Sequence, residues 1–212
     1  CLFIIVLSYF VFPHLLKITH PKRWIWIIGG CALLGGIGLQ YSINPFSLQV
    51  DRWSAIHFWI QNFFSGKYPY GAQTHLNGYG SPFPVWQFIH IPFYWMGNVA
   101  LSAFVACIAW IYTTTKTISP KAGLINLLGL VLAPAFWYEI ATRSDLMTNM
   151  IVSAIIVQWL LYKKYTLTNN TIKIGIIAGL LLSTRLISII PLCVAFGYEF
   201  FMVPWLKKIG AD

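Results

Sequence analysis

Long apolar runs without polar alternation constrain the fold of this chain more than any other feature of its sequence. Residues 24–43 and 92–115 contain no charged side chain at all. A barrel strand would alternate apolar and polar positions, and these runs do not. Only 9% of the residues are charged, whereas a soluble domain carries about a quarter. The sequence therefore predicts an all-α fold, a polytopic transmembrane helix bundle.

The predicted spans are about seven in number, and those in the second half are shorter than the roughly 20 residues of a perpendicular crossing. They cover residues 1–17, 24–43, 92–115, 122–138, 146–162, 172–186 and 188–206. We treat residues 1–212 as a single transmembrane domain. The chain starts at Cys1 within an apolar run and stops soon after Lys208, so we expect it to be a piece of a longer protein.

The basic residues predict the orientation of these spans. Most of them follow the odd-numbered spans, at Lys17, Lys22, Arg23, Lys116, Lys121, Lys163, Lys164, Lys173, Lys207 and Lys208. By the positive-inside rule that side is cytoplasmic. The net charge of +9 then reflects topology and lipid headgroups, and we expect no nucleic-acid partner. The predicted location is a bacterial-type inner membrane.

The one long connection, residues 44–84, falls on the extracytoplasmic side and is rich in Gly, Pro, Tyr, Asn and His. Within it, WSAIHFWIQNFF has the apolar spacing of an amphipathic helix lying in the membrane interface. Its Trp and Phe residues suit an aromatic belt at headgroup depth. A loop of this length is usually functional or disordered, and this one is too aromatic to be disordered.

Three of the five acidic residues, Asp51, Glu139 and Asp145, lie at or near the predicted outer face. Asp51 comes just before the interfacial helix, where an acid caps the N-terminus and favours the helix dipole. Alternatively, Asp51 is a general base that takes a proton from an acceptor hydroxyl. The two roles are compatible.

Arg185 lies in the apolar run GLLLSTRLISIIP, where burying a charge costs about 2.5–3.5 kcal/mol on insertion scales. One interpretation is a structural ion pair with Asp145 or Glu139. The other is a ligand for a phosphate group that enters from the lipid, because the guanidinium fork matches phosphate oxygens. Arg143 and Arg52 are further candidates for phosphate binding.

No motif for a cofactor or metal stands out. His57, His75 and His90 are scattered, and no P-loop, GxSxG, HExxH or dinucleotide fingerprint occurs. We therefore predict no metal ligands and no certain cofactor. A divalent cation stays open, because the three outer carboxylates are hard oxygen ligands.

Several motifs together resemble the first outer loop of GT-C type glycosyltransferases, in particular the mannosyltransferase-like ones. The order is an aspartate just after an early span, then GKYPYG, then GSPFP leading into an apolar run that ends in FYWMGN. The later stretch GIIAGLLLSTRLISIIPLCV is similar to the recurring pair of short helices in that family. The family is polytopic and uses polyprenyl-phosphate sugars as donors, and its members are longer than this chain.

The resemblance implies roles for individual residues. Asp51 matches the catalytic carboxylate of the family, and Arg185 with Arg143 matches basic positions near the lipid-linked phosphate. Tyr70, His75, Asn77 and Asp145 would lie on the substrate side, lining the sugar or acceptor.

These observations lead to three functional hypotheses. The first is a membrane glycosyltransferase that moves a sugar from a polyprenyl-phosphate donor to an acceptor on the outer face. Its partners would be the lipid-linked sugar and membrane lipid. The second is a transporter or flippase for a lipid-linked substrate, which would place polar groups near mid-membrane. The third is a non-catalytic subunit of an envelope complex, with the long loop as its docking surface.

Overall fold

A computed structural model of the chain describes residues 18–202. The regular structure of this part is helical, apart from one isolated bridge between Gln73 and Tyr79, and this confirms the predicted all-α class. The elements in chain order are α2 (Pro21–Ser42), η1 (Pro45–Ser47), α3 (Arg52–Phe64), η2 (Pro69–Gly71), α4 (Pro84–Ile89), α5 (Ile91–Trp95), α6 (Leu101–Thr117), α7 (Pro120–Leu132), α8 (Pro134–Ala141), α9 (Leu146–Tyr162), α10 (Leu167–Leu182), η3 (Leu186–Ile189) and α11 (Ile190–Met202).

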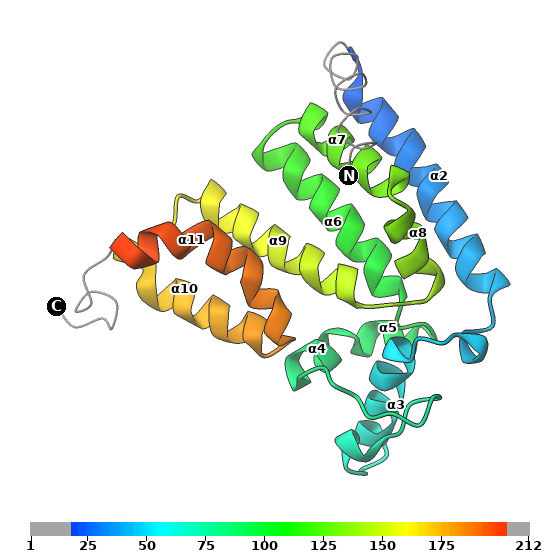
Figure 1. Cartoon of the computed structure of the whole chain (residues 1–212). Helices are drawn as coiled ribbons and strands as arrows, with labels where there is room; N and C mark the ends of the chain where they lie inside the picture. The colour runs from blue at the N-terminus through cyan, green and yellow to red at the C-terminus, as the bar shows by residue number, and fades with distance from the viewer. Residues whose placement is uncertain (1–17, 203–212) are drawn as a thin grey trace.

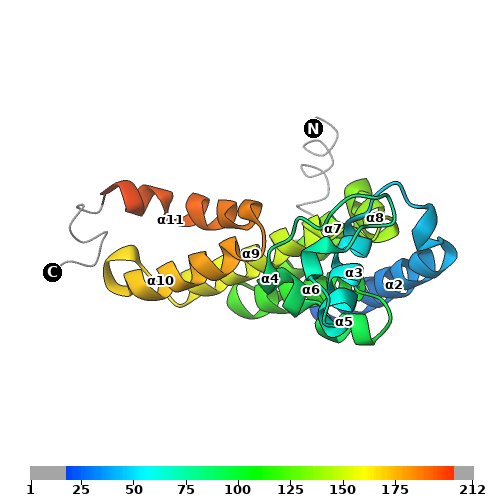
Figure 2. The ribbon, with the colours of Figure 1, turned by 90° about the horizontal axis from the view of Figure 1, so that it is seen from below.

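The long helices form a bundle with the short ones gathered at one end (Figure 1). Helix α6 packs between α7 and α9, and α2 packs against α7 and α8. Helix α11 packs on α9 and on α10. Helices α10 and α11 together project from the other helices (Figure 2). Helices α3, α4 and α5, together with the loop between them, lie below the ends of α2, α6 and α9 in Figure 1. We call residues 44–100 the outer segment.

Proline residues and polar caps determine where several helices begin. Pro21, Pro84, Pro120 and Pro134 each stand in the first turn of a helix, where the missing N–H removes no intrahelical bond. The Ser119 hydroxyl accepts a hydrogen bond from the Ala122 amide at the start of α7. Such caps satisfy amides that the helix itself leaves open.

The predicted span 122–138 is broken in the middle. Helices α7 and α8 are bent by 67° relative to each other. Pro134 explains the bend, since its ring excludes the preceding residue from helical geometry and removes a donor. Ala133 accordingly has an extended backbone, with φ −80° and ψ 118°.

Length and composition support fewer crossings than predicted. Within residues 18–202, α2 alone is long and apolar enough to cross a membrane, and the bent α7–α8 pair would be a second span if counted as one. The 92–115 segment is divided into α5 and α6 by a turn that includes Gly97 at φ 81°. The seven crossings therefore stay a prediction, and the predicted span 1–17 lies outside the described residues.

The charged residues separate along the bundle. Basic side chains stand at the first turn of α2, the last turn of α6, the first turn of α7 and the end of α9. The opposite helix ends carry Arg52, Glu139, Asp145 and Arg185. In the described part of the chain, one end of the bundle is therefore mainly basic, with Glu199 as an acid among the lysines, and acids and arginines meet at the other end.

The outer segment has its own apolar core. Trp53, Ile56, Trp59 and Ile60 of α3 are buried against Trp86, with Val99 completing the cluster. The apolar stripe of α3 therefore faces protein, whereas the sequence pattern suggested that it faces the membrane interface. Its two tryptophans serve as core residues and not as a headgroup belt.

Candidate functional site

Asp51 stands at the N-cap position of α3, but its side chain does not cap the helix. Its Oδ2 accepts a hydrogen bond of 2.8 Å from the Thr74 hydroxyl. Thr74 belongs to a tight turn in which its backbone N–H binds the Gly78 carbonyl and its hydroxyl accepts from the Gly78 amide. The loop thus folds back onto Asp51 and fixes the direction of its carboxylate, which is half-buried.

Arg52 connects the outer segment to the bundle. Its Nη1 donates to the Ser144 hydroxyl at 2.7 Å, across a sequence separation of 92 residues. The same nitrogen lies 4.0 Å from Oε1 of Glu139. The Arg52 side chain remains 37% exposed, so part of its guanidinium faces outward.

Asp145 and Arg185 form a buried ion pair. Nη2 of Arg185 lies 2.8 Å from Oδ1 and 2.7 Å from Oδ2, and Nε lies 3.1 Å from Oδ2. The indole N–H of Trp86 donates a further bond of 2.5 Å to Oδ2. Because a buried charge needs both a partner and hydrogen bonds, Asp145 is well satisfied at 4% exposure. The structure thus contains the ion pair that was one interpretation of Arg185.

Arg185 does not sit inside a continuous helix. It has an extended backbone between the end of α10 and the start of η3. One residue earlier, the Thr184 carbonyl accepts a hydrogen bond of 3.0 Å from the Phe83 amide. The Thr184 hydroxyl also accepts from Nδ2 of Asn149 on α9. This break in the helix is where the outer segment, α9 and the last helices are tied together.

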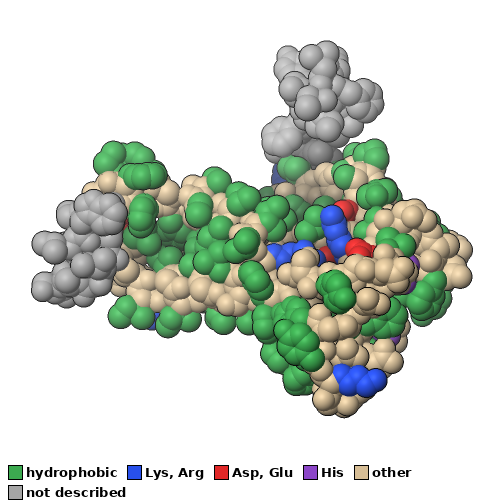
Figure 3. Space-filling view, turned by 60° about the horizontal axis from the view of Figure 1, so that its bottom comes forward, with side chains coloured by type: hydrophobic (Ala, Val, Ile, Leu, Met, Phe, Trp, Pro, Cys, Tyr) green, Lys and Arg blue, Asp and Glu red, His purple; other side chains and the backbone are tan. Residues whose placement is uncertain are grey.

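Four charged residues from four separate parts of the chain therefore gather at one end of the bundle. We call Arg52, Glu139, Asp145 and Arg185 the charge cluster; Ser144 adjoins it through Arg52. Figure 3 shows basic and acidic side chains side by side near the middle of this face, surrounded by uncharged ones. Asp51 precedes Arg52 directly, so the candidate base lies at the margin of the cluster.

Arg143 points to a different place. Its backbone adopts φ 53°, and its Nη2 donates to the carbonyl of Gln40 at the end of α2. Burial lowers the pKa of Arg143 below its ordinary value, which Tyr41 partly offsets. The geometry therefore joins Arg143 to α2 and not to the charge cluster.

Two of the predicted substrate-side residues are occupied by internal bonds. The Tyr70 hydroxyl donates to the Pro82 carbonyl at 3.1 Å, and burial raises the pKa of Tyr70. His75 places Nε2 2.8 Å from the Leu48 carbonyl and Nδ1 2.7 Å from the Ser54 hydroxyl. Their geometry is that of residues that shape the loop.

Asn77 differs from these two residues. Its side chain is exposed and its φ of 61° forms the tip of the turn that holds Asp51. It is therefore the predicted substrate-side residue that stays open to a ligand next to the candidate base.

Sequence reasoning missed three residues of this arrangement. Trp86, Thr74 and Ser144 bond directly to Asp145, Asp51 and Arg52. Trp86 sits in an apolar run, where only the indole N–H is polar. A threonine or a serine is too common to mark a site, so neither had a signal beyond its proximity to a candidate residue.

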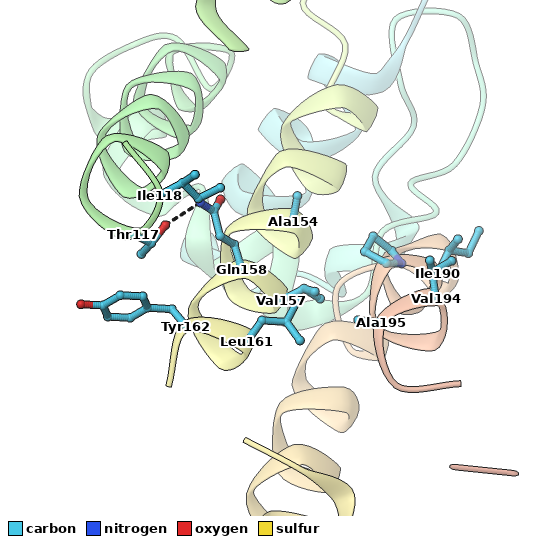
Figure 4. Close-up of a pocket in the computed structure, with 11 residues that line it drawn as sticks. Thr117, Ile118, Ala154, Val157, Gln158, Leu161, Tyr162, Ile190, Val194 and Ala195 are labelled. Carbon is cyan, nitrogen blue, oxygen red and sulfur yellow. Dashed lines mark hydrogen bonds between the residues drawn. The ribbon is translucent and has the colours of Figure 1, made fainter. Parts of the chain in front are cut away.

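The described residues contain no group of three or more His, Cys, Asp or Glu side chains that could hold a metal ion. An open pocket of about 580 Å³ lies elsewhere, between α9, α11 and the end of α6. Figure 4 shows Gln158 bonded to Thr117 on one side of this pocket and Ile190 and Val194 on the other. None of the predicted site residues lines it.

The end of the bundle that carries the charge cluster is therefore the candidate site. Comparison with known protein families, with curated protein sequences and with solved structures gave no match.

Proposed function

We propose that this chain is a multi-pass membrane protein that transfers a sugar from a polyprenyl-phosphate donor to an acceptor hydroxyl on the extracytoplasmic face of a bacterial-type inner membrane. The single observation that carries the proposal is the bond between Arg52 and Ser144. It brings the Asp51–Arg52 pair beside the Asp145–Arg185 pair at the end of the bundle opposite the basic loops.

The surface of the helices supports a membrane environment. Only 11% of the most apolar window of α2 is buried inside the fold. Trp26, Leu34 and Tyr41 on this helix are 82%, 73% and 83% exposed. Contiguous apolar surface of this extent is rare on soluble monomers, and lipid tails would cover it. The concentration of lysines at one end of the bundle fits the same placement.

The two arginines have different parts in the proposed reaction. Both carboxylate oxygens of Asp145 already occupy the fork of Arg185, so Arg185 holds Asp145 and the turn around it in place. Arg52 is more exposed, and its partners among residues 18–202 are a hydroxyl and a distant carboxylate. Arg52 is therefore the residue we assign to the phosphate oxygens.

Asp51 is assigned as the general base that takes the proton of the acceptor hydroxyl. In the proposed reaction the acceptor hydroxyl forms a bond to the anomeric carbon of the sugar, and its proton passes to Asp51. The bond between that carbon and the phosphate oxygen breaks, and polyprenyl phosphate leaves with charge stabilised by Arg52. The hydrogen bond of 2.8 Å from Thr74 fixes the direction of the Asp51 carboxylate, which supports this role.

Transfer in proteoliposomes that contain polyprenyl-phosphate sugars tests this proposal. Asp51→Asn keeps the size and removes the base, so transfer should fall by about 10²–10⁴-fold, as for other general bases. Glu199→Gln is the matched control, because Glu199 accepts a bond from the Leu167 amide at the basic end. Full transfer by Asp51→Asn would reject the assigned mechanism.

The same vesicles distinguish the transporter hypothesis. Movement of the lipid-linked sugar between leaflets, with no new glycosidic bond and no effect of Asp51→Asn, would replace transfer by transport. Loss of assembly with neighbouring envelope proteins, while neither activity is seen, would favour the scaffold hypothesis.

A further inference from the structure

An exposed apolar surface covers the last turn of α3 together with α4 and α5. Its six side chains are 42–70% exposed: Phe63, Phe64, Phe88, Ile89, Trp95 and Met96. Ring contacts make it continuous, because Phe63 lies 5.6 Å from Phe64 and 5.4 Å from Phe88, and Phe64 lies 5.8 Å from Trp95, all between ring centroids. We call these six residues the aromatic patch.

The aromatic patch is separate from the core of the outer segment. Trp59 is 3% exposed and stacks on Phe63 with ring centroids 5.6 Å apart. The patch therefore lies on top of that core and forms a distinct exposed surface. It also lies at the opposite end of α3 from Asp51 and Arg52, and α3 has 13 residues, or about 20 Å.

The chemistry of the patch fits the headgroup region of a lipid bilayer. No Asp or Glu occurs between positions 52 and 138, and the exposed Lys67 follows the last turn of α3. Trp and Tyr rings concentrate at membrane interfaces, and a lysine beside them reaches the anionic headgroups. A surface for a soluble protein partner would more often have a polar rim around its apolar centre.

The chain also leads from the patch into an apolar helix face. Helix α6 begins at Leu101, shortly after Met96, and Val105, Ile108 and Tyr112 are 53%, 57% and 62% exposed along one side of it. These positions follow the spacing of a single helix face. An interfacial patch followed by a lipid-facing helix is the order that entry into a bilayer requires.

We propose that the aromatic patch docks into the headgroup region of the outer leaflet and holds the outer segment at a fixed depth. The start of α3, with Asp51 and Arg52, is then held about 20 Å along the helix from that anchor. This inference rests on the membrane placement of the proposed function and does not depend on the transfer chemistry.

Depth-dependent fluorescence quenching in proteoliposomes tests it. The native cysteines are replaced by serine, and single labels are introduced through Trp95→Cys in the patch and Leu76→Cys outside it. Leu76 is a matched control, because it is apolar and 41% exposed but lies in the turn near Asp51. Lipids that carry a quencher close to the headgroup should reduce the emission at position 95 more strongly than at position 76.

A third label separates failure of this inference from failure of the membrane placement. Leu34→Cys on α2 should be quenched by lipids that carry the quencher deep in the acyl chain. Quenching at 34 without quenching at 95 overturns the docking of the patch alone. No quenching at either position overturns the membrane placement. Energy transfer between labels at position 95 on two copies, without lipid quenching, assigns the patch to self-association and also overturns the proposal.

Discussion

The Arg185 guanidinium binds both carboxylate oxygens of Asp145, with Nη2 2.8 Å from Oδ1 and 2.7 Å from Oδ2. The two residues come from the start of α9 and from the break after α10. The pair therefore connects parts of the bundle that no continuous helix joins, and Trp86 adds the outer segment to the same carboxylate.

Removing one partner of this pair should be far more damaging than removing both. Asp145→Ala leaves a buried guanidinium unpaired and should lower the free energy of unfolding by about 3–5 kcal/mol. Asp145→Leu combined with Arg185→Met should lose less than Asp145→Ala alone. Thermal unfolding in detergent measures both variants.

Glu139→Gln is the control for that comparison. Its contact to Arg52 is long, at 4.0 Å, and partly exposed, so its loss should cost less than about 1 kcal/mol. Equal destabilisation by Asp145→Ala and Glu139→Gln would contradict the buried role of Asp145.

The turn beside Asp51 leaves no room for a larger residue at one glycine. A Cβ at Gly78 would lie 2.9 Å from Oδ2 of Asp51, whereas at Gly80 the nearest atom would be 3.5 Å away. Gly78→Ala should displace the Asp51 carboxylate and reduce transfer by about 10²-fold, the usual cost of a 1 Å misplacement. Gly80→Ala should keep near-normal transfer under the same assay, and equal activity of both variants would separate Asp51 from catalysis.

Helices α6 and α7 approach each other closely at Gly123. A Cβ there would lie 2.1 Å from Oγ1 of Thr115 and 3.3 Å from the Ile111 carbonyl, but a Cβ at Gly129 on the same helix meets nothing within 4 Å. Gly123→Ala should destabilise the fold by about 1–3 kcal/mol through overpacking. Gly129→Ala should stabilise it by about 0.5–1 kcal/mol, because glycine weakens a helix interior. Chemical denaturation that ranks the two variants in the reverse order would refute this packing.

Acid should weaken the outer segment through His90. Burial lowers the pKa of His90 below its ordinary value of 6.5, and the Trp86 carbonyl only partly offsets this. The fold thus favours the neutral His90 ring. The contribution of His90 to the free energy of unfolding is therefore complete above pH 6.5 and is lost as the pH falls from there toward the folded-state pKa. The slope should reach about 1.4 kcal/mol per pH unit for one proton.

Unfolding measured from about pH 8 to about pH 5 checks this slope. His90→Asn should have a smaller slope than the wild type, whatever its absolute stability. Some slope should remain, because burial also lowers the pKa of His57. Identical slopes in both proteins would rule out His90 as the titrating group.

The helical class and the separation of charge could be predicted because composition and the positions of lysines carry that information locally. The break at Pro134 was also local, but the predicted span ran through it because apolar length outweighed one residue. The burial of Trp53 and Trp59 of α3 in the protein was not predicted, since periodicity identifies an apolar stripe and cannot say whether protein or lipid covers it. The interfacial position of α3 stays a prediction.

The site was predictable only in part, for a related reason. Charged residues in apolar surroundings are conspicuous, so an ion pair of Arg185 with Asp145 or Glu139 could be suggested from its cost, but the choice of Asp145 comes from the structure. Trp86 and Ser144 reach the cluster from 59 and 92 residues away from their partners, and their types are ordinary in their own segments. Which uncharged side chain completes a charged cluster depends on tertiary packing, and a single sequence does not reveal that packing.

The contacts between the outer segment and later parts of the chain also have a consequence for biosynthesis. Phe83 and Trp86 bind Thr184 and Asp145, so the outer segment reaches its final form only after residue 184 has been made. Until residue 184 has been made, the outer segment lacks these two contacts. Assembly of the charge cluster therefore depends on residues as far apart in the sequence as Arg52 and Arg185.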